Sequence, residues 1–160
     1  MTGGNPGPVC AVREKFPGDA EALVALARGL GGAFDAAALA RLARDVADHA
    51  GLVAERSGTH LGFATWATGD GAGSSELTCL AVADAHQRRG VGTVLCEALE
   101  ERLRSRGVRS LEASLPAAWV IRPDLERARR FLLARGFREV RVDVGHWGPE
   151  NDRLLLRRGL

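Results

Sequence analysis

Seven residues in the middle of the chain have the types and spacing of an anion-binding loop. They separate an apolar segment from one with helical periodicity, and they are Gln87, Arg88, Arg89, Gly90, Val91, Gly92 and Thr93. A strand that continues through such a loop into a helix presents backbone N–H groups without internal partners, and the helix dipole adds partial positive charge. Glycines allow a ligand to approach closely and arginines add full charges, which suits a pyrophosphate. On the glycine spacing alone, an ordinary strand-to-helix turn explains the loop equally well.

Two other phosphate-binding patterns fit this loop poorly. The dinucleotide fingerprint requires a third glycine, and Leu95 stands at that position. The P-loop ends in Gly-Lys-Ser or Gly-Lys-Thr, and the loop contains no lysine. Neither a dinucleotide site nor a P-loop is therefore our expectation.

The elements around the loop follow from the hydrophobic pattern. Strands are predicted within 9–16, on both sides of a turn at 57–59 within 52–68, and at 76–83, 108–115, 137–144 and 152–160. Helices are predicted at 20–30, 36–50, 91–107 and 124–136. The three strands between residues 52 and 83 are expected to be antiparallel neighbours. This order predicts an α/β (α+β) fold with a mixed sheet and helices on both faces.

Helix ends and helix faces can also be predicted from single residues. Asp19, Asp35 and Asp124 precede helical runs and predict N-caps, while Gly51 and Gly136 predict helix ends. Glu100 and Arg104 have the spacing of an exposed ion pair on the helix after the loop. The apolar stripe of that helix is predicted to be Val91, Leu95, Ala98, Leu99 and Leu103.

Composition narrows the class of protein. The chain has 160 residues, 46% of them hydrophobic and 26% charged, which predicts a single globular domain over 1–160 with a disordered Gly/Pro-rich start at 1–8. Its arginines are interleaved with acids, which argues against a nucleic-acid partner. No run approaches the length of a membrane span. Cys10, Cys79 and Cys96 have no metal-ligand spacing, so we expect no metal site and a reducing, cytoplasmic location.

The loop resembles the acetyl-CoA signature of the GNAT N-acetyltransferase superfamily, Gln/Arg-x-x-Gly-x-Gly/Ala, through Gln87, Gly90 and Gly92. The resemblance extends to the segment "VAERSGTHLGFA", to the strand, loop and helix at 76–107, and to the last helix with Gly136-Phe137. It covers nearly the whole chain from Val9. It implies a GNAT fold, with a mostly antiparallel sheet of six to seven strands that splays between strands 4 and 5.

The resemblance also implies how the co-substrate acetyl-CoA is bound. Main-chain groups of Leu80 and Val82 would pair with the pantetheine arm as if it were an added strand. Main-chain N–H groups from Gln87 through Thr93, a stretch that includes Arg88, Arg89 and Val91, would hold the pyrophosphate. Ala128 and Phe131 on the last helix would flank the far end of the cofactor. Core packing is the alternative role for Leu80, Val82 and Phe131.

Acetyl transfer to an amine requires a group that removes a proton, because the ammonium form has no lone pair. Glu76 lies eleven residues before Gln87, the spacing of the glutamate base in the histone-acetyltransferase branch of the family. Strand alternation puts it on one face with Thr78, Leu80 and Val82. The rival bases are Asp84, His86 and Glu112; His146 and Trp147 are placed near the acceptor, and His49 and His60 are expected to be structural.

The chain departs from the family pattern at the general acid. Leu132 stands where many members carry a tyrosine, Leu125 stands where an asparagine often opens the helix, and the chain has no tyrosine. Water, Ser114 or Cys79 would then assist the departing CoA thiolate. No cysteine stands where a nucleophile is expected, so the amine would attack the thioester directly.

The predicted function is an acetyl-CoA-dependent N-acetyltransferase that acts on a primary amine in a ternary complex. The alternative is a non-catalytic acyl-CoA-binding module, a sensor or partner subunit, which the missing tyrosine and asparagine suggest. The acceptor has no readable motif. Trp119 and Ile121 suggest an apolar wall for it, and the carboxylates that would receive a cationic acceptor are Glu112, Asp124 and Asp143. A homodimer through exposed strands at the end of the sheet is our expectation for assembly, with no membrane partner.

Overall fold

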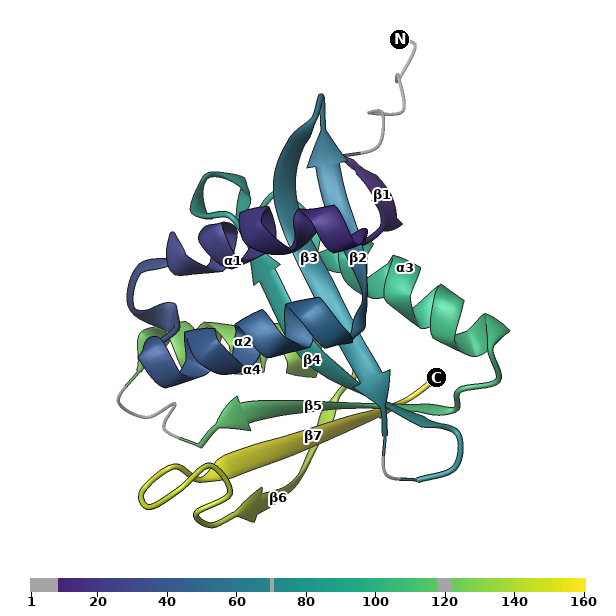
Figure 1. Cartoon of the computed structure of the whole chain (residues 1–160). Helices are drawn as coiled ribbons and strands as arrows, with labels where there is room; N and C mark the ends of the chain where they lie inside the picture. Colours follow the sequence, from purple (N-terminus) through teal and green to yellow (C-terminus); the bar gives the residue numbers. More distant parts are fainter. Residues whose placement is uncertain (1–8, 70, 118–121) are drawn as a thin grey trace, which may run out of the picture. The chain divides into compact units, whose positions relative to one another are not determined.

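Helices and strands follow one another in the order that the sequence pattern predicts (Figure 1). The computed structural model describes residues 9–69, 71–117 and 122–160. The strands are β1 (Ala11–Glu14), β2 (Ala50–Arg56), β3 (Thr59–Thr68), β4 (Ser74–Val82), β5 (Ser110–Pro116), β6 (Arg138–Asp143) and β7 (Arg153–Gly159). The α-helices are α1 (Ala20–Arg28), α2 (Ala36–Asp48), α3 (Val91–Ser105) and α4 (Pro123–Ala134). The predicted disordered segment 1–8, and Trp119 and Ile121 of the predicted acceptor wall, lie outside the described residues.

The strands form one mixed sheet in the order β1-β2-β3-β4-β5-β7-β6. β4 and β5 are parallel, whereas β1–β2, β2–β3, β5–β7 and β6–β7 are antiparallel. This confirms the predicted mixed, mostly antiparallel sheet. Between β4 and β5 the register joins Ser74–Leu77 to Ser110–Ala113. Both strands continue beyond this paired part, to Val82 in β4 and to Pro116 in β5.

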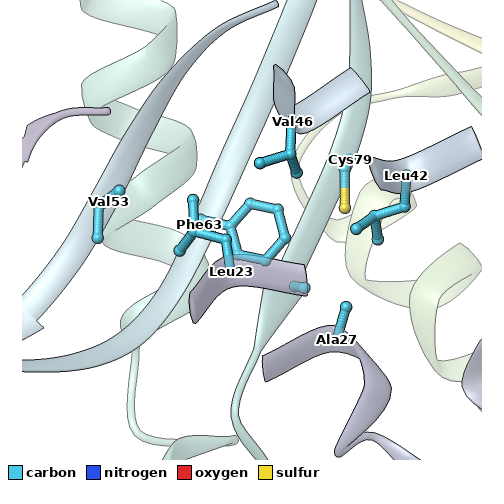
Figure 2. Packing of buried hydrophobic residues seen from close by; sticks show 8 residues of the cluster. Leu23, Ala27, Leu42, Val46, Val53, Phe63 and Cys79 are labelled. Atoms are coloured by element: carbon cyan, nitrogen blue, oxygen red, sulfur yellow. The ribbon is translucent and has the colours of Figure 1, made fainter. Parts of the chain in front are cut away.

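Contacts divide the chain into two units, and the first combines the described part of Met1–Trp66 with Cys79–Arg102. In this unit α1 and α2 cross one face of the strands (Figure 1). Figure 2 shows the apolar core between them, and no member of this core is more than 8% exposed. Its members are Leu23, Ala27, Leu42, Val46, Val53, Phe63, Cys79 and Ala81.

The opposite face of β3 is covered by α3. Phe63 packs in the α1/α2 core, so its neighbour Gly62 faces the other way. A Cβ placed on Gly62 would lie 3.3 Å from Leu95 of α3 and 2.7 Å from the carbonyl oxygen of Ala81 on β4. Glycine at this position therefore permits the close approach of β3, β4 and α3, and the first unit has helices on both faces as predicted.

The buried face of α3 differs from the predicted one. Val91, Leu95, Leu99 and Leu103 are at most 1% exposed, as expected. Glu100, however, is only 3% exposed, so the prediction that it lies on an exposed face of the helix is wrong. Cys96 is also buried. Because Cys96 and Glu100 are four residues apart, they lie next to each other on the helix, and the buried face of α3 is wider than the predicted stripe.

Of the three predicted N-caps, the structure forms one. The carboxylate of Asp35 accepts the N–H of Ala38 at 2.7 Å, which caps α2. Asp19 stands before α1, but its carboxylate makes no cap bond to this helix. It instead accepts two hydrogen bonds of 2.8 and 2.9 Å from Arg13 of β1, and one of 2.7 Å from the N–H of Phe16 at the start of the short 3-10 helix Pro17–Asp19. Asp124 lies inside the first turn of α4 and pairs with Arg122.

Gly51 does not end α2, because the helix stops at Asp48 and Gly51 already belongs to β2. A Cβ on Gly51 would lie 3.0 Å from the carbonyl oxygen of Ala64 and 3.1 Å from the side chain of Lys15. The glycine is thus explained by close packing with β3 and not by a helix end.

The second unit contains Ala67–Thr78 and Leu103–Leu160. Its buried hydrophobic side chains come from β4, the end of α3, β5, α4 and β7, and from Phe137 between α4 and β6. They are Leu77, Leu103, Leu111, Ala113, Leu125, Leu132, Phe137, Leu154, Leu155 and Leu156. Gly136 has a φ of +91°, a left-handed conformation that favours glycine and ends α4 as predicted.

Candidate active site

The loop between β4 and α3 has the backbone geometry of an anion site. A short 3-10 helix, Asp84–His86, leads into four exposed residues, Gln87 to Gly90. Arg88 and Gly90 have positive φ angles of 58° and 85°. The N–H of Val94 makes the helical bond to the carbonyl of Gly90 at 3.0 Å, so the N–H groups of Val91–Thr93 have no acceptor within the helix. These N–H groups and the dipole of the 15-residue helix favour an anion.

Arg88 and Arg89 add positive charge at this position. Both side chains belong to exposed residues, and neither forms an ion pair with a carboxylate in the part of the chain that the structure describes. Arginine is an unusual choice at a φ of +58°, because a Cβ disfavours the left-handed region. The two guanidinium groups thus add positive charge beside the N–H groups that begin α3.

The side chain of Gln87 points back to the strand. Its Nε2 donates to the carbonyl of Val82 at 3.0 Å and to Oδ1 of Asp84 at 3.1 Å. The sequence predicted a main-chain role for Gln87 but not this contact. The side chain thus fixes the start of the loop to the end of β4, and it also holds the carboxylate of Asp84, one of the rival bases.

Burial along β4 alternates as predicted for the donor-binding strand. Ser75, Leu77, Cys79 and Ala81 are buried, and the residues between them are half-buried. Glu76, Thr78, Leu80 and Val82 consequently share one face, with the predicted base at the start of the strand and the predicted pantetheine contacts at its end.

Cys79 lies on the opposite face, within the α1/α2 core. Burial, with the nearby charge of Asp45, raises the pKa of its thiol to about 12. A thiol with that pKa is protonated at neutral pH and is a poor nucleophile. Cys79 is therefore unsuited to act as a covalent nucleophile.

Glu76 has two polar neighbours on β5. It lies in register with Glu112, and Oγ of Ser114 donates to its Oε1 at 3.5 Å. Glu112 itself accepts two hydrogen bonds from Arg157 of β7, at 2.7 and 3.1 Å. Of the two neighbouring carboxylates, Glu112 is therefore neutralised by a guanidinium, whereas Glu76 contacts a hydroxyl.

Most of the chain matches a known protein family. The model of the acetyltransferase (GNAT) family matches residues 22–137. The chain belongs to the GNAT acetyltransferase family. Among curated proteins, none matches the chain significantly.

Solved GNAT structures share the fold over nearly the whole chain. A family member from Desulfovibrio desulfuricans is 21% identical, covers 93% of this chain and 99% of its own, and has a TM-score of 0.79. The ribosomal-protein-alanine N-acetyltransferase of Brucella melitensis is 26% identical over 94% of this chain and 99% of its own, with a TM-score of 0.71. The protein yncA of Salmonella typhimurium, solved with its cofactor acetyl-CoA, is 21% identical over 94% of each chain, with a TM-score of 0.68.

The two departures from the GNAT pattern on α4 are both core residues. Leu125 and Leu132 are 7% and 5% exposed, and they are the buried residues of this helix. Two residues that are seven apart lie on the same side of a helix, so both leucines belong to the packed side. Ala128 and Phe131, predicted to flank the cofactor, are half-buried.

The other residues that the sequence singled out each have neighbours of their own. His49 lies 3.6 Å from Asp45, and His60 lies 3.3 Å from Asp19, which fits the structural roles expected for both histidines. His146 and Trp147 stack edge to face between β6 and β7, with ring centroids 5.3 Å apart. Asp143 of β6, predicted as an acceptor contact, is bound by Arg141 and Arg153. His86 is half-buried at the end of the 3-10 helix.

Metal sites and membrane-spanning helices were both sought among the described residues. Within residues 9–69, 71–117 and 122–160, no three His, Cys, Asp or Glu side chains gather as a metal site would require. No helix in these ranges combines the length and apolar character needed to cross a bilayer.

Proposed function

We propose that the protein is an acetyl-CoA-dependent N-acetyltransferase that moves the acetyl group to a primary amine by direct attack in a ternary complex. One observation carries the proposal: in a GNAT chain, the signature loop enters α3 with positive φ angles at Arg88 and Gly90. The acetyl-CoA in the yncA structure supports the same co-substrate here.

The donor contacts follow the strand and the loop. Main-chain N–H groups from Gln87 to Thr93 hold the pyrophosphate, and Arg88 and Arg89 add charge. Main-chain groups of Leu80 and Val82 pair with the pantetheine arm. The carbonyl oxygen of Val82 already accepts a hydrogen bond from the side chain of Gln87. It can therefore accept one further hydrogen bond from the pantetheine arm, through its second lone pair. Ala128 and Phe131 flank the far end of the donor.

Glu76 is the proposed general base. Amines with a pKa near 10 are mostly protonated at neutral pH, so a positioned carboxylate increases the fraction that can attack. Glu76 is half-buried on the face of β4 that also bears Leu80 and Val82. Its closest rival, Glu112, is engaged by Arg157.

A non-catalytic acyl-CoA-binding module is the second candidate function. The observation that favours it is the burial of Leu125 and Leu132, because neither position offers a polar group to the reaction. Such a module would retain the loop and the donor contacts but would lack turnover.

Two measurements on the full chain distinguish the candidates. Acetyl-CoA at a hundredfold excess over Kd should stabilise the protein by about 2.7 kcal/mol in either case. Free thiol should then appear when a panel of amines is added, including small amines, aminoglycosides, a lysine peptide and a peptide with a free N-terminus. Stabilisation without thiol release would support the binding module, and absence of stabilisation would contradict both.

A further inference from the structure

Ser114 lies beside Glu76 at the end of the paired part of β4 and β5. The register sets Glu76 opposite Glu112 and Leu77 opposite Ala113, where the pairing ends. Ser114 is therefore the first residue of β5 beyond the paired part, and alternation puts it on the face of Glu76 and Glu112. Its hydroxyl donates to Oε1 of Glu76 over 3.5 Å, and both residues are half-buried.

The order of the proposed donor contacts directs the thioester toward this pair. The pyrophosphate is proposed at the loop and the pantetheine arm at Val82 and then Leu80, so the arm runs back along β4. If the arm continues in this direction along β4, the next residues on the same face of the strand are Thr78 and then Glu76. This step rests on the proposed function.

The other groups that might supply a proton to the thiolate are less suitable. Leu132, at the position of the usual tyrosine, is an apolar core residue. Cys79 faces the α1/α2 core, on the side of β4 opposite to Glu76. Glu112 is held in an ion pair with Arg157, and the chain contains no tyrosine.

We propose that Ser114 is a catalytic residue that passes the amine's proton from Glu76 to the departing CoA thiolate. Glu76 takes a proton from the bound ammonium, the nitrogen of the resulting amine forms a bond to the acetyl carbon, and the carbon–sulfur bond breaks. The second proton that this nitrogen loses as it becomes an amide goes to solvent. Glu76 gives the proton that it took to Oγ of Ser114, and the hydroxyl proton of Ser114 goes to sulfur. The products are the amide and free CoA thiol, and both residues return to their starting protonation states.

The hydrogen-bonding capacity of the pair permits this exchange. A hydroxyl has one donor and two acceptor sites, and an ionised carboxylate only accepts. Before the reaction Ser114 therefore donates to Glu76, as observed. Once Glu76 is protonated it becomes the donor, and the hydroxyl hydrogen of Ser114 is released to point at another acceptor.

The test compares two leaving groups in the full chain. Ser114→Ala should lower kcat with acetyl-CoA by about a hundredfold, the low end of the effect of a positioned acid, with Kd for acetyl-CoA unchanged. With the acetyl thioester of a nitrothiophenol, whose thiolate leaves without a proton, the loss should be less than about threefold. Ser114→Thr should recover most of the rate. Ser110→Ala, on the same face of β5 within the paired part, is the matched control and should behave as wild type.

Each outcome supports or overturns the relay. A loss below about twofold with acetyl-CoA, or an equal loss with both thioesters, overturns it. If Ser114→Ala does not fold, the isosteric pair Ser114→Thr and Ser114→Val replaces it, and equal rates for the two overturn the relay. A wild-type protein that binds acetyl-CoA but acetylates no amine overturns the proposed function and the relay together, whereas active wild type with an unaffected Ser114→Ala overturns the relay alone.

Discussion

At the scale of single residues, neighbouring groups distinguish carboxylates that look equivalent in the sequence. Glu76 and Glu112 are adjacent in the sheet, yet Glu112 is bound to Arg157 and Glu76 contacts a serine hydroxyl. Asp84 is bound by Gln87. Of these three carboxylates, Glu76 is the one that no guanidinium or amide group binds in the contacts described above, and we propose it as the general base.

Replacing Glu76 by glutamine should lower turnover without weakening donor binding. The amide has similar size but cannot accept the proton of the amine, so kcat should fall by about a hundredfold at neutral pH. The loss should shrink at higher pH, as more of the amine is already neutral. The measurements are kcat from about pH 6 to pH 9 and Kd for acetyl-CoA by calorimetry. Glu101→Gln, at an exposed position of α3, is the control. Full activity of Glu76→Gln over the whole range would show that another group is the base.

Replacing Gln87 by methionine should weaken the binding of CoA. Methionine keeps the length of the side chain but removes the bonds to Val82 and Asp84, each worth about 1 kcal/mol, so Kd should rise by about tenfold or more. A pantetheine fragment, which lacks the pyrophosphate, should be affected less than about twofold. Equal weakening of CoA and of the fragment would mean that the side chain acts on the arm and not on the loop.

At the scale of elements, an ion-pair network joins β1 to the start of α1. The guanidinium of Arg13 binds Asp19, donates to Glu55 of β2 at 3.0 Å, and lies 4.9 Å from the ring of Phe16. Asp19 also accepts the N–H of Phe16 at 2.7 Å and contacts His60 of β3. Residues 13–19 and the β2–β3 hairpin, which are distant in the sequence, are thus joined through the buried carboxylate of Asp19 and the guanidinium of Arg13.

This network should make stability depend on pH in the acid range. Hydrogen bonds from Arg13, and then from Phe16 and His60, hold the pKa of Asp19 well below its usual 3.8. A carboxyl with a lowered folded-state pKa stabilises the fold above its unfolded-state pKa, and this stabilisation is lost as the pH falls further. Wild-type stability should therefore decrease as the pH drops below about 4.

The variant Asp19→Asn tests this dependence. It should lower the free energy of unfolding at neutral pH by about 2 kcal/mol and flatten the decrease in acid, as measured by urea denaturation from about pH 7 to pH 2. Asp48→Asn, at an exposed position of α2, should keep the wild-type profile. An acid profile of Asp19→Asn identical to that of wild type would contradict the assignment to Asp19.

The network also shows where prediction from sequence stops. Periodicity correctly predicted the element order, the two faces of β4 and the α2 cap at Asp35, because these depend on residues close in the chain. The role of Asp19 depends on Arg13 of a packed strand, and that contact overrides its preference for capping. Likewise, the contact between Ser114 and Glu76 joins residues 38 positions apart and depends on strand register, which local patterns do not specify.

At the scale of the whole molecule, the chain belongs to the GNAT family. It differs from the family pattern at the residue expected to protonate the departing thiolate. The family model spans 22–137, and solved relatives match over more than nine-tenths of the chain. The chain lacks the usual tyrosine, and the leucine in its place is buried. The proposed transfer therefore requires a proton donor other than tyrosine, and the raised pKa of the buried Cys79 thiol makes Cys79 a poor nucleophile for it.

The most direct test of this account is to follow thiol release and intact protein mass together, with acetyl-CoA in the presence and absence of an acceptor amine. If transfer is direct, thiol should accumulate over many turnovers only when the amine is present, and the protein should never carry an acetyl group. A burst of thiol equal to the enzyme concentration without amine, together with an acetylated protein, would contradict direct transfer.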